Sequence, residues 1–331
     1  MISTKNLHTF HLNTVAANVL HIDDESQLSQ LWELPGPFMI LGQGSNTVFI
    51  EDYDGHLVIN ELKGVEFSET EEHYLLSVKS GENWHELIKY CLSKQIYGFE
   101  NLALIPGTVG AAPIQNIGAY GIEIERFIKT VHFYQFSNNE IKTLSREQCQ
   151  FGYRDSIFKK ELKQQGFITQ VDFLLPKQWQ PVCIYAPLNT LESPTAHEIF
   201  EQVCHTRKQK LPDPAVLGNA GSFFKNPIVE EDVATSLLKN YPNMPCYEVD
   251  YGLKKLAAGW LIEQAGLKGF VHKNVAVHDA QALVLVNKSG KASGEELLQL
   301  ISIVKDKVLD CFAIELEPEV QLIGRQGDLS V

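Results

Sequence analysis

The stretch FMILGQGSNTVFI, residues 38–50, places a glycine-rich loop between two apolar runs that predict buried strands. The loop, Gly42-Gln43-Gly44-Ser45-Asn46, superficially matches a dinucleotide fingerprint. It fails the test for a Rossmann site, because Thr47 and the β-branched and aromatic residues after it predict a strand where that site needs a helix. Successive backbone N–H groups in a strand–loop–strand unit can still hold a pyrophosphate; the alternative is a plain glycine hairpin.

Two more segments are rich in glycine. From Ile105 to Gly121, glycines alternate with small apolar residues, so this backbone can lie against a flat coenzyme ring; tight packing of the loop on the protein explains the same pattern. Residues 218–227, GNAGSFFKNP, present the Ser222 hydroxyl directly after a glycine, with Lys225 and Asn226 close behind. The alternative there is a glycine turn followed by a strand whose phenylalanines fill a core.

Two charged residues stand out by their neighbours. Arg154 lies in Phe151-Gly152-Tyr153-Arg154-Asp155-Ser156, and its guanidinium can bind a substrate carboxylate through two parallel hydrogen bonds; the alternative is a surface Arg–Asp pair. Glu319 falls in a predicted strand, residues 314–320, that contains Pro318. A buried, protonated Glu319 can act as an acid, whereas a carboxylate on an edge strand stays at the surface.

Composition narrows the class of protein. A chain of 331 residues predicts two or three domains, and 44% hydrophobic with 21% charged residues is typical of a soluble globular enzyme. The net charge of −13 argues against nucleic acid as a partner. Six scattered cysteines without metal-ligand spacing predict free thiols in a reducing compartment and no metal site. Without a signal peptide or a membrane span, we expect a cytoplasmic protein without a membrane partner.

Local signals predict several elements. Asp24 with Gln27 resembles a capping box, and Ser293 with Glu296 resembles another. A helix from Asn83 should bury one apolar face, and Ser193-Pro194 should start a second helix that ends in basic residues. Residues 256–265 predict a helix and residues 282–286 a strand. Seven segments, taken together and in order, form the most specific sequence pattern of the chain: residues 41–46, 105–121, 152–156, 210–214, 218–227, 258–262 and 316–320.

In order and in content, these segments resemble the bacterial UDP-N-acetylenolpyruvoylglucosamine reductases of peptidoglycan synthesis, over nearly the whole chain. The resemblance implies an α+β fold: a vanillyl-alcohol-oxidase-type FAD-binding fold in two parts, plus an α+β substrate-binding domain. The implied boundaries are residues 1–66 with the C-terminal strand 318–331, residues 67–207, and residues 208–317. The segment Pro181-Val182-Cys183-Ile184-Tyr185 looks like the loop of the family's longer form, in which a tyrosine closes over substrate.

The same resemblance implies an NADPH-dependent flavin oxidoreductase with tightly bound FAD, acting as a monomer on a UDP-sugar enolpyruvyl ether. Ser222 is implied as the proton donor, and Arg154 and Glu319 as the residues that polarise the substrate carboxylate. The residues implied to hold FAD are Gly42, Gly44, Ser45, Asn46, Thr47, Ile105, Gly107, Val109, Gly110 and Gly118. The residues implied to bind substrate are Tyr120, Tyr185, Arg207, Lys210, Asn226 and Gln281.

Two positions depart from the family pattern. Gln321 stands where relatives commonly carry a basic residue, which leaves one positive charge fewer near the substrate carboxylate. Ala111 stands where some relatives have a serine, which implies the loss of one hydrogen bond to flavin. The competing hypotheses are another FAD oxidase or dehydrogenase of the same fold, and a non-catalytic nucleotide-sugar or flavin-binding regulator. Neither needs the acid–base residues Ser222 and Glu319.

Overall fold

The structure is a computed structural model that describes residues 1–249 and 252–330, apart from the side chains of residues 32 and 33. The chain forms two compact units. Unit 1 comprises residues 1–17, 44–54 and 210–331, and unit 2 comprises residues 18–43 and 55–209. Because both units draw on separate stretches of chain, the glycine loop at residues 42–46 passes from unit 2 into unit 1.

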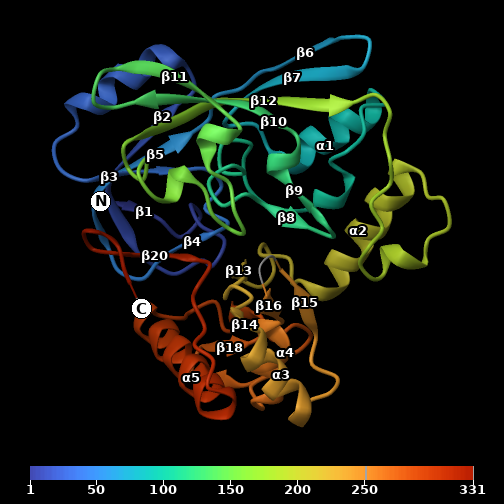
Figure 1. The fold of residues 1–331 in the computed structure, drawn as a ribbon. Coiled ribbons are helices and arrows are strands. Elements are labelled where there is room, and N and C mark those ends of the chain that lie inside the picture. The colour runs from blue at the N-terminus through green and yellow to red at the C-terminus, as the bar shows by residue number, and fades with distance from the viewer. Residues whose placement is uncertain (250–251, 331) are drawn as a thin grey trace. The chain divides into compact units, whose positions relative to one another are not determined.

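Unit 2 is built on a five-stranded antiparallel sheet with the strand order β11-β10-β12-β7-β6 (Figure 1). Its strands are β6 (Val65–Glu69), β7 (His73–Lys79), β10 (Ile128–Gln135), β11 (Glu140–Ser145) and β12 (Gly166–Pro176). The apolar side chains on one face of β7, β10 and β12 join the core of the unit together with helix α1 (Trp84–Ser93). Helix α2 (Ala196–Lys210) contributes Ile199 and Val203 to the same core.

Helix α1 forms where the sequence predicts it. The Asn83 side chain accepts a hydrogen bond from the backbone N–H of Glu86 at 2.9 Å, which satisfies one of the N–H groups left open at a helix start. The residues at helical spacing are all buried: Trp84, Leu87, Ile88, Cys91 and Leu92. The predicted apolar face is therefore confirmed.

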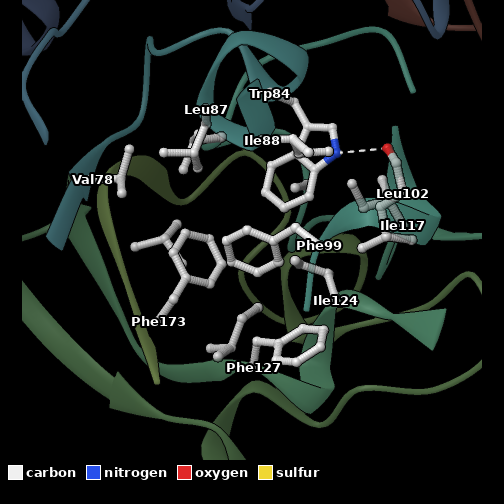
Figure 2. Packing of buried hydrophobic residues seen from close by; sticks show 14 of the residues in the cluster. Val78, Trp84, Leu87, Ile88, Phe99, Leu102, Ile117, Ile124, Phe127 and Phe173 are labelled. Atoms are coloured by element: carbon white, nitrogen blue, oxygen red, sulfur yellow. Dashed lines mark hydrogen bonds between the residues drawn. The ribbon is translucent and has the colours of Figure 1, made fainter. Parts of the chain in front are cut away.

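An aromatic cluster fills the centre of this core (Figure 2). The ring of Phe99 lies 5.1 Å from that of Trp84 and 5.2 Å from those of Phe127 and Phe173, with edge-to-face geometry in each case. The indole N–H of Trp84 donates to the carbonyl oxygen of Leu102 at 3.0 Å, so no buried polar group of this indole is left open. The cluster thus fixes the short helix η2 (Glu100–Leu102), which follows Phe99 directly.

Strands β2 (Val15–Ile22) and β5 (Tyr53–Asn60) lie mostly in unit 2 and β3 (Phe38–Leu41) lies entirely in it; β3 and β5 run parallel. The predicted capping box of Asp24 and Gln27 is confirmed, although the element that it starts, η1 (Glu25–Glu33), is a 3-10 helix. The other short elements of the unit are β8 (Gly118–Ala119), β9 (Ile122–Glu123), η3 (Ile124–Arg126), η4 (Glu147–Cys149), η5 (Ile157–Lys159) and η6 (Leu188–Thr190).

Unit 1 contains small sheets around one core. An antiparallel sheet has the order β13-β19-β18-β17, a second has β14-β16-β15, and a third has β21-β20-β4, in which β20 runs parallel to β4. The strands of these sheets are β4 (Thr47–Phe49), β13 (Asn219–Ser222), β14 (Ile228–Glu230), β15 (Cys246–Glu248), β16 (Leu253–Leu256), β17 (Val271–His272), β18 (Val275–Val277), β19 (Val284–Asn287), β20 (Gln321–Gly324) and β21 (Gly327–Asp328). Strand β1 (Ile2–Ser3) pairs with β2 instead. Because β4 pairs with β20 and β3 with β5, the loop at residues 42–46 is not a hairpin.

Three helices complete unit 1: α3 (Glu231–Asn240), α4 (Ala258–Gln264) and α5 (Gly294–Phe312). The capping box of Ser293 and Glu296 starts α5 as predicted, and the expected apolar face of that helix is buried. Helix α4 starts later than the predicted residue 256, because Leu256 pairs with Cys246 in the β15–β16 ladder. The predicted strand at residues 282–286 is β19, shifted by one or two residues at its ends.

One predicted element is wrong. Residues 314–320 form no strand; Pro318 makes only an isolated bridge to Phe224, and pairing resumes at Gln321 in β20. Proline has no backbone N–H to donate to a ladder, which explains the interruption. The alternation that suggested a strand is real, since Ile314 and Leu316 are buried while Glu315 is exposed.

Candidate functional site

Ser222 ends strand β13, and its side chain is exposed. Gly221 before it has φ +71°, and nothing lies within 4 Å of the position where a Cβ would stand. A register shift interrupts the β13–β19 ladder between Asn219 and Ser222. The two phenylalanines after Ser222 are fully buried. The segment is thus both a glycine turn leading into a core and a hydroxyl presented at an open position.

The segment with Glu319 runs beside the segment with Ser222. The backbone N–H of Glu319 donates to the carbonyl of Phe223 at 2.8 Å, and the N–H of Lys225 donates to the carbonyl of Glu317 at 2.9 Å. The ammonium of Lys225 lies 2.6 Å from the Glu317 carboxylate, so this lysine pairs with a surface carboxylate. Because Glu319 is bonded to Phe223, it lies across from the residue that directly follows Ser222. Glu319 is half-buried.

Two hydrogen bonds also tie the second half of the glycine loop to the segment with Glu319. The side-chain NH₂ of Asn46 donates to the carbonyl of Glu319 at 3.1 Å, and the backbone N–H of Gln321 donates to the carbonyl of Asn46 at 2.9 Å. The carbonyl of Gly44 accepts from Thr9 at 3.2 Å. Two carbonyls of the loop therefore point into the protein, which is what an anion nest of N–H groups requires. Gly44 itself has φ +60°, and a Cβ there would stand 2.0 Å from a backbone oxygen.

In unit 2 the first half of the loop lies against the stretch 105–121. The side-chain oxygen of Gln43 accepts from the N–H of Gly107 at 3.1 Å. A Cβ on Gly42 would stand 2.8 Å from the Thr108 hydroxyl, and one on Gly110 would stand 2.5 Å from the Ser80 side chain. Tight packing on the protein, the alternative stated for residues 105–121, therefore holds at Gly110, and Gly42 in the other loop is packed just as closely.

The other residues implied for FAD have defined places. Thr47 begins β4 opposite Gln321, and Gly118 begins β8, where a Cβ would stand 2.9 Å from the Glu123 side chain. The side chain of Val109 lies fully inside the core of unit 2, so only its main chain can face a ligand. Ile105 is half-buried at the edge of that core.

Arg154 stands in a tight turn of unit 2 at φ +54°. Its guanidinium donates to the carbonyl of Gly118 at 3.0 Å. The turn is held by Asn116, which is fully buried: its amide donates to the carbonyl of Gly152 at 3.1 Å, and its oxygen accepts from the N–H of Glu125 at 3.1 Å. The position of Arg154 therefore depends on one side chain that the sequence did not single out.

Arg207, on helix α2, adds a second guanidinium, close enough to Tyr120 and Arg154 to interact electrostatically with both. Burial lowers the pKa of Arg207 from its ordinary value, against the opposing effect of Tyr120 and in the same direction as the effect of Arg154. Its Nε atom is buried and has no hydrogen-bond partner among the described residues. Burial also raises the pKa of the Tyr120 hydroxyl, while Arg207 lowers it. Two guanidinium groups and a phenol gathered in this way favour an anionic ligand.

Tyr185 lies in unit 2 and is 38% exposed. Its ring packs on the backbone of Gly121, where a Cβ would stand 3.3 Å from two ring carbons. Because Gly121 follows Tyr120 directly, the two tyrosines implied to bind substrate come from segments in contact.

The last three implied substrate residues lie in unit 1. Lys210 ends helix α2 and is exposed. The side-chain oxygen of Asn226 accepts from the N–H of Ala258 at 3.0 Å and thereby caps helix α4, whose own N-cap is an alanine. The side-chain oxygen of Gln281 faces Leu283 N–H at 3.5 Å. Both amide oxygens face the main chain, while the amide NH₂ groups have no partner among the described residues.

The departure at Gln321 has a structural use. Its side-chain NH₂ donates to the carboxylate of Asp328 at 2.5 Å, within the β20–β21 hairpin. The uncharged residue is thus held by a neighbouring strand.

Among the described residues no group of three or more His, Cys, Asp or Glu side chains is arranged to hold a metal ion, and all six cysteines are free thiols. In the same part of the chain, no helix is both long and apolar enough for a membrane span.

Comparison with known proteins agrees with this arrangement. The family model described as UDP-N-acetylenolpyruvoylglucosamine reductase, C-terminal domain, matches residues 213–323, and the model described as FAD binding domain matches residues 16–145. The reductase of that name from Pseudoalteromonas atlantica is 49% identical over 327 residues, which cover 98% of this chain and 94% of the relative. The one from Salmonella typhimurium is 46% identical over 334 residues, covering 99% and 97%. The crystal structure of UDP-N-acetylenolpyruvylglucosamine reductase from Thermus caldophilus shares the fold, with a TM-score of 0.68 at 20% identity and 97% coverage of both chains.

Proposed function

The chain belongs to the UDP-N-acetylenolpyruvoylglucosamine reductase family, and from that premise we propose that it reduces UDP-N-acetylglucosamine enolpyruvate to UDP-N-acetylmuramate. The reaction is NADPH-dependent and FAD-mediated, and it belongs to peptidoglycan precursor synthesis. The fold is α+β, with a vanillyl-alcohol-oxidase-type FAD-binding part and a substrate-binding domain. Both the family and the fold implied by the sequence motifs are confirmed.

The residues present fit FAD. The Gly44 and Asn46 carbonyls are bonded to the protein, which a nest of backbone N–H groups for a pyrophosphate requires. When bound, FAD accepts a hydride from NADPH and passes it to the substrate. We assign its binding to the residues Gly42, Gly44, Ser45, Asn46, Thr47, Ile105, Gly107, Val109, Gly110 and Gly118. Gly42 and Gly110 serve this indirectly, because their missing side chains let the loops lie close to Thr108 and Ser80.

The observation that carries the chemistry is the hydrogen bond from Glu319 N–H to Phe223 O, which sets Glu319 beside the exposed Ser222. Addition of hydride to the methylene carbon of the enol ether places negative charge on the next carbon and on the carboxylate. Ser222 donates its hydroxyl proton to that carbon, and Arg154 and Glu319 stabilise the charge on the carboxylate. A serine hydroxyl is a weak acid, so it depends on these neighbours.

Substrate binding is assigned to Tyr120, Tyr185, Arg207, Lys210, Asn226 and Gln281. The buried, unpartnered Nε of Arg207 supports an anionic ligand, and the open NH₂ groups of Asn226 and Gln281 support hydrogen bonds to a sugar or a base. Lys210 adds positive charge to a protein whose net charge is −13. Tyr185, packed on the residue after Tyr120, is assigned to cover the substrate.

The same proposal includes three features of the working protein. The chain divides into residues 1–66 with 318–331, residues 67–207, and residues 208–317, as two FAD-binding parts and a substrate-binding part. It acts as a monomer, and it acts in the cytoplasm, where its free thiols stay reduced.

A stopped-flow measurement at flavin absorbance wavelengths tests the function. NADPH should bleach the protein's colour, and the enolpyruvyl UDP-sugar should restore it under anaerobic conditions. Return of the colour with oxygen alone would show an oxidase of the same fold, and a colourless protein that takes up no FAD would show a non-catalytic binder. Either result overturns the proposal.

A further inference from the structure

The segment between β12 and α2 (Figure 1) carries Tyr185. Two adjacent buried residues of η2 hold this segment by hydrogen bonds. We refer to residues 177–187 as the lid segment. Its Trp179 is held by Glu100 and its Val182 by Asn101. Since η2 directly follows Phe99 of the buried aromatic cluster, these anchors connect the lid segment to the core of unit 2.

Asn101 makes the more informative contact. Its NH₂ group donates to the carbonyl of Val182 at 2.8 Å and to the carbonyl of Tyr120 at 2.9 Å. One carboxamide therefore bridges the lid segment and the turn that carries Tyr120. Asn101 is 1% exposed, so water does not compete for these bonds.

The oxygen of the same carboxamide is buried without a hydrogen-bond partner among the described residues. An unsatisfied buried acceptor destabilises a fold, so Asn101 is a poor choice for stability alone. An apolar side chain of similar size would avoid that cost but would leave the Val182 and Tyr120 carbonyls without a donor. Asn101 therefore fits a role in positioning the segments of Val182 and Tyr120 better than a role in stabilising the fold.

Glu100 fixes the other side of the lid segment. One of its carboxylate oxygens accepts from the Trp179 indole N–H at 2.5 Å, and the other accepts from the N–H of Gly98 at 2.7 Å. The indole also packs edge-to-face on Tyr97 at 5.7 Å. With Trp179 held at one point and Val182 at another, the chain that leads to Tyr185 has two fixed points three residues apart.

Tyr185 ends this chain of contacts. Its ring and the side chain of Val182 both lie against Gly121, at 3.3 Å and 3.4 Å from the position of a Cβ there. The Asn101 bridge therefore acts on both sides of the contact, because it holds the carbonyl of Tyr120 on one side and that of Val182 on the other.

We propose that Asn101 is a positioning residue: it holds the segments of Tyr185 and Tyr120 in a fixed relative position, so that both tyrosine side chains can contact the substrate together. The proposal deepens the proposed function and rests on it, since the substrate named there is the ligand of that surface. Asn101 touches neither flavin nor substrate in this account; it acts through the two segments that it bridges.

The test replaces Asn101 in the FAD-loaded enzyme. Asn101→Leu keeps the size of the side chain and removes both donors, and Asn101→Ser keeps one donor. For Asn101→Leu we expect the KM for the enolpyruvyl UDP-sugar to rise roughly tenfold, because two bonds that order the lid segment are lost. Flavin reduction by NADPH should proceed at the wild-type rate. Asn101→Ser should show a smaller rise in the KM, so the proposal can still be tested if the leucine variant does not fold.

The matched control is Asn287→Leu. Asn287, in unit 1, is also a buried asparagine whose NH₂ donates to two carbonyls, those of Phe10 and His11. It should lose stability as Asn101→Leu does and keep the wild-type KM. A wild-type KM in folded Asn101→Leu, or an equal rise in both variants, overturns the proposal.

Two further measurements separate position from function. In a Tyr185→Ala background, Asn101→Leu should raise the KM by a smaller factor than it does in the wild type; fully additive effects would show that Asn101 does not act through Tyr185. Deuterium uptake at the amides of residues 182–186 should rise in Asn101→Leu and stay at the wild-type level in Asn287→Leu. This readout needs no substrate. If the wild-type enzyme does not turn over the enolpyruvyl UDP-sugar, the proposed function fails, whereas unchanged deuterium uptake in Asn101→Leu defeats the positioning role.

Discussion

The two units hold their implied site residues in different ways. In unit 1, Glu319 is placed mainly by main-chain hydrogen bonds that pair residues 317–321 with Phe223, Lys225 and Asn46, and the side chain of Asn46 adds one bond to the Glu319 carbonyl. In unit 2, Arg154 and the lid segment are placed by the side-chain amides of Asn116 and Asn101. A ladder of main-chain bonds survives the replacement of a side chain, and a carboxamide bridge does not. Substitutions in unit 1 should therefore change chemistry without moving the site, and those in unit 2 should move it.

The largest effect should come from Ser222→Ala. The residue lies at an exposed position, and its neighbour Phe223 keeps its main-chain bonds to Leu283 and Glu319. We expect reoxidation of reduced flavin by the enolpyruvyl UDP-sugar to slow by roughly 10²–10⁴-fold, the usual contribution of a placed proton donor. Flavin reduction by NADPH should stay near normal. Stopped-flow absorbance resolves the two half-reactions, and an equal fall in both would show that Ser222 is not the donor.

Asn116→Asp should give the second largest effect and should sharpen the contrast between the units. The carboxylate keeps the acceptor for the Glu125 N–H but loses the donor to the Gly152 carbonyl and faces the carboxylate of Glu123. We expect about 2–3 kcal/mol less stability and a clear rise in the KM for substrate, because the turn that carries Arg154 loosens. Urea unfolding and steady-state kinetics measure the two.

The control for this variant is Arg154→Lys, which removes the planar guanidinium but leaves the turn intact. It should raise the KM with little loss of stability. If Asn116→Asp lowered stability while the KM stayed at the wild-type value, the buried amide would hold the fold and not the arginine.

The signals that succeeded in the sequence were local ones. The caps at Asn83 and Ser293 and the apolar faces behind them depend on residues within a few positions of each other, so they could be predicted. The wrong strand at residues 314–320 failed for a non-local reason: alternation is a local pattern, but a strand needs a partner, and Pro318 allows only a single bridge. The glycines show the same limit, since the packing at Gly42 and Gly110 involves residues 30 to 66 positions away.

The positioning amides could not be found in the sequence at all. Asn101 and Asn116 differ from other asparagines only by the carbonyls that surround them, and these come from segments that the fold brings together. An Asn inside a glycine-rich stretch, as at position 116, is the one signal available. The residues proposed to do chemistry stand in recognisable motifs, and the residues proposed to position them do not.

A smaller effect should appear in the pH dependence of stability. Asp172 lies in the sheet of unit 2, where burial alone would raise its pKa; hydrogen bonds from His132, Thr130, Gln170 and Ser77 outweigh burial and hold the pKa well below its usual range. A lowered pKa means that the folded protein binds fewer protons than the unfolded chain. The stabilisation is therefore complete above the unfolded value, about 4, and is lost as the pH falls below it.

Asp172→Asn removes this dependence. Compared with the wild type, the variant should be less stable at pH 7, and the difference between the two free energies of unfolding should shrink between about pH 5 and pH 3. Urea midpoints at several pH values measure it, and the difference cancels the titration of the other carboxylates. A gap between the proteins that stays constant with pH would mean that the Asp172 network is not charge-dependent.

The smallest effect should come from Ser293→Ala, which tests the contrast from the side of unit 1. The Ser293 hydroxyl accepts from the N–H of Glu296 at 3.2 Å and starts helix α5, whose buried face fills the core of the unit. Loss of such a cap costs about 1 kcal/mol. Because Glu319 is held beside Ser222 by main-chain bonds and not by this helix start, the rates of both flavin half-reactions should stay at wild-type values while the urea midpoint falls. A slower reoxidation in this variant would show that the site in unit 1 is as sensitive to remote side chains as the site in unit 2, and the distinction between the two would be lost.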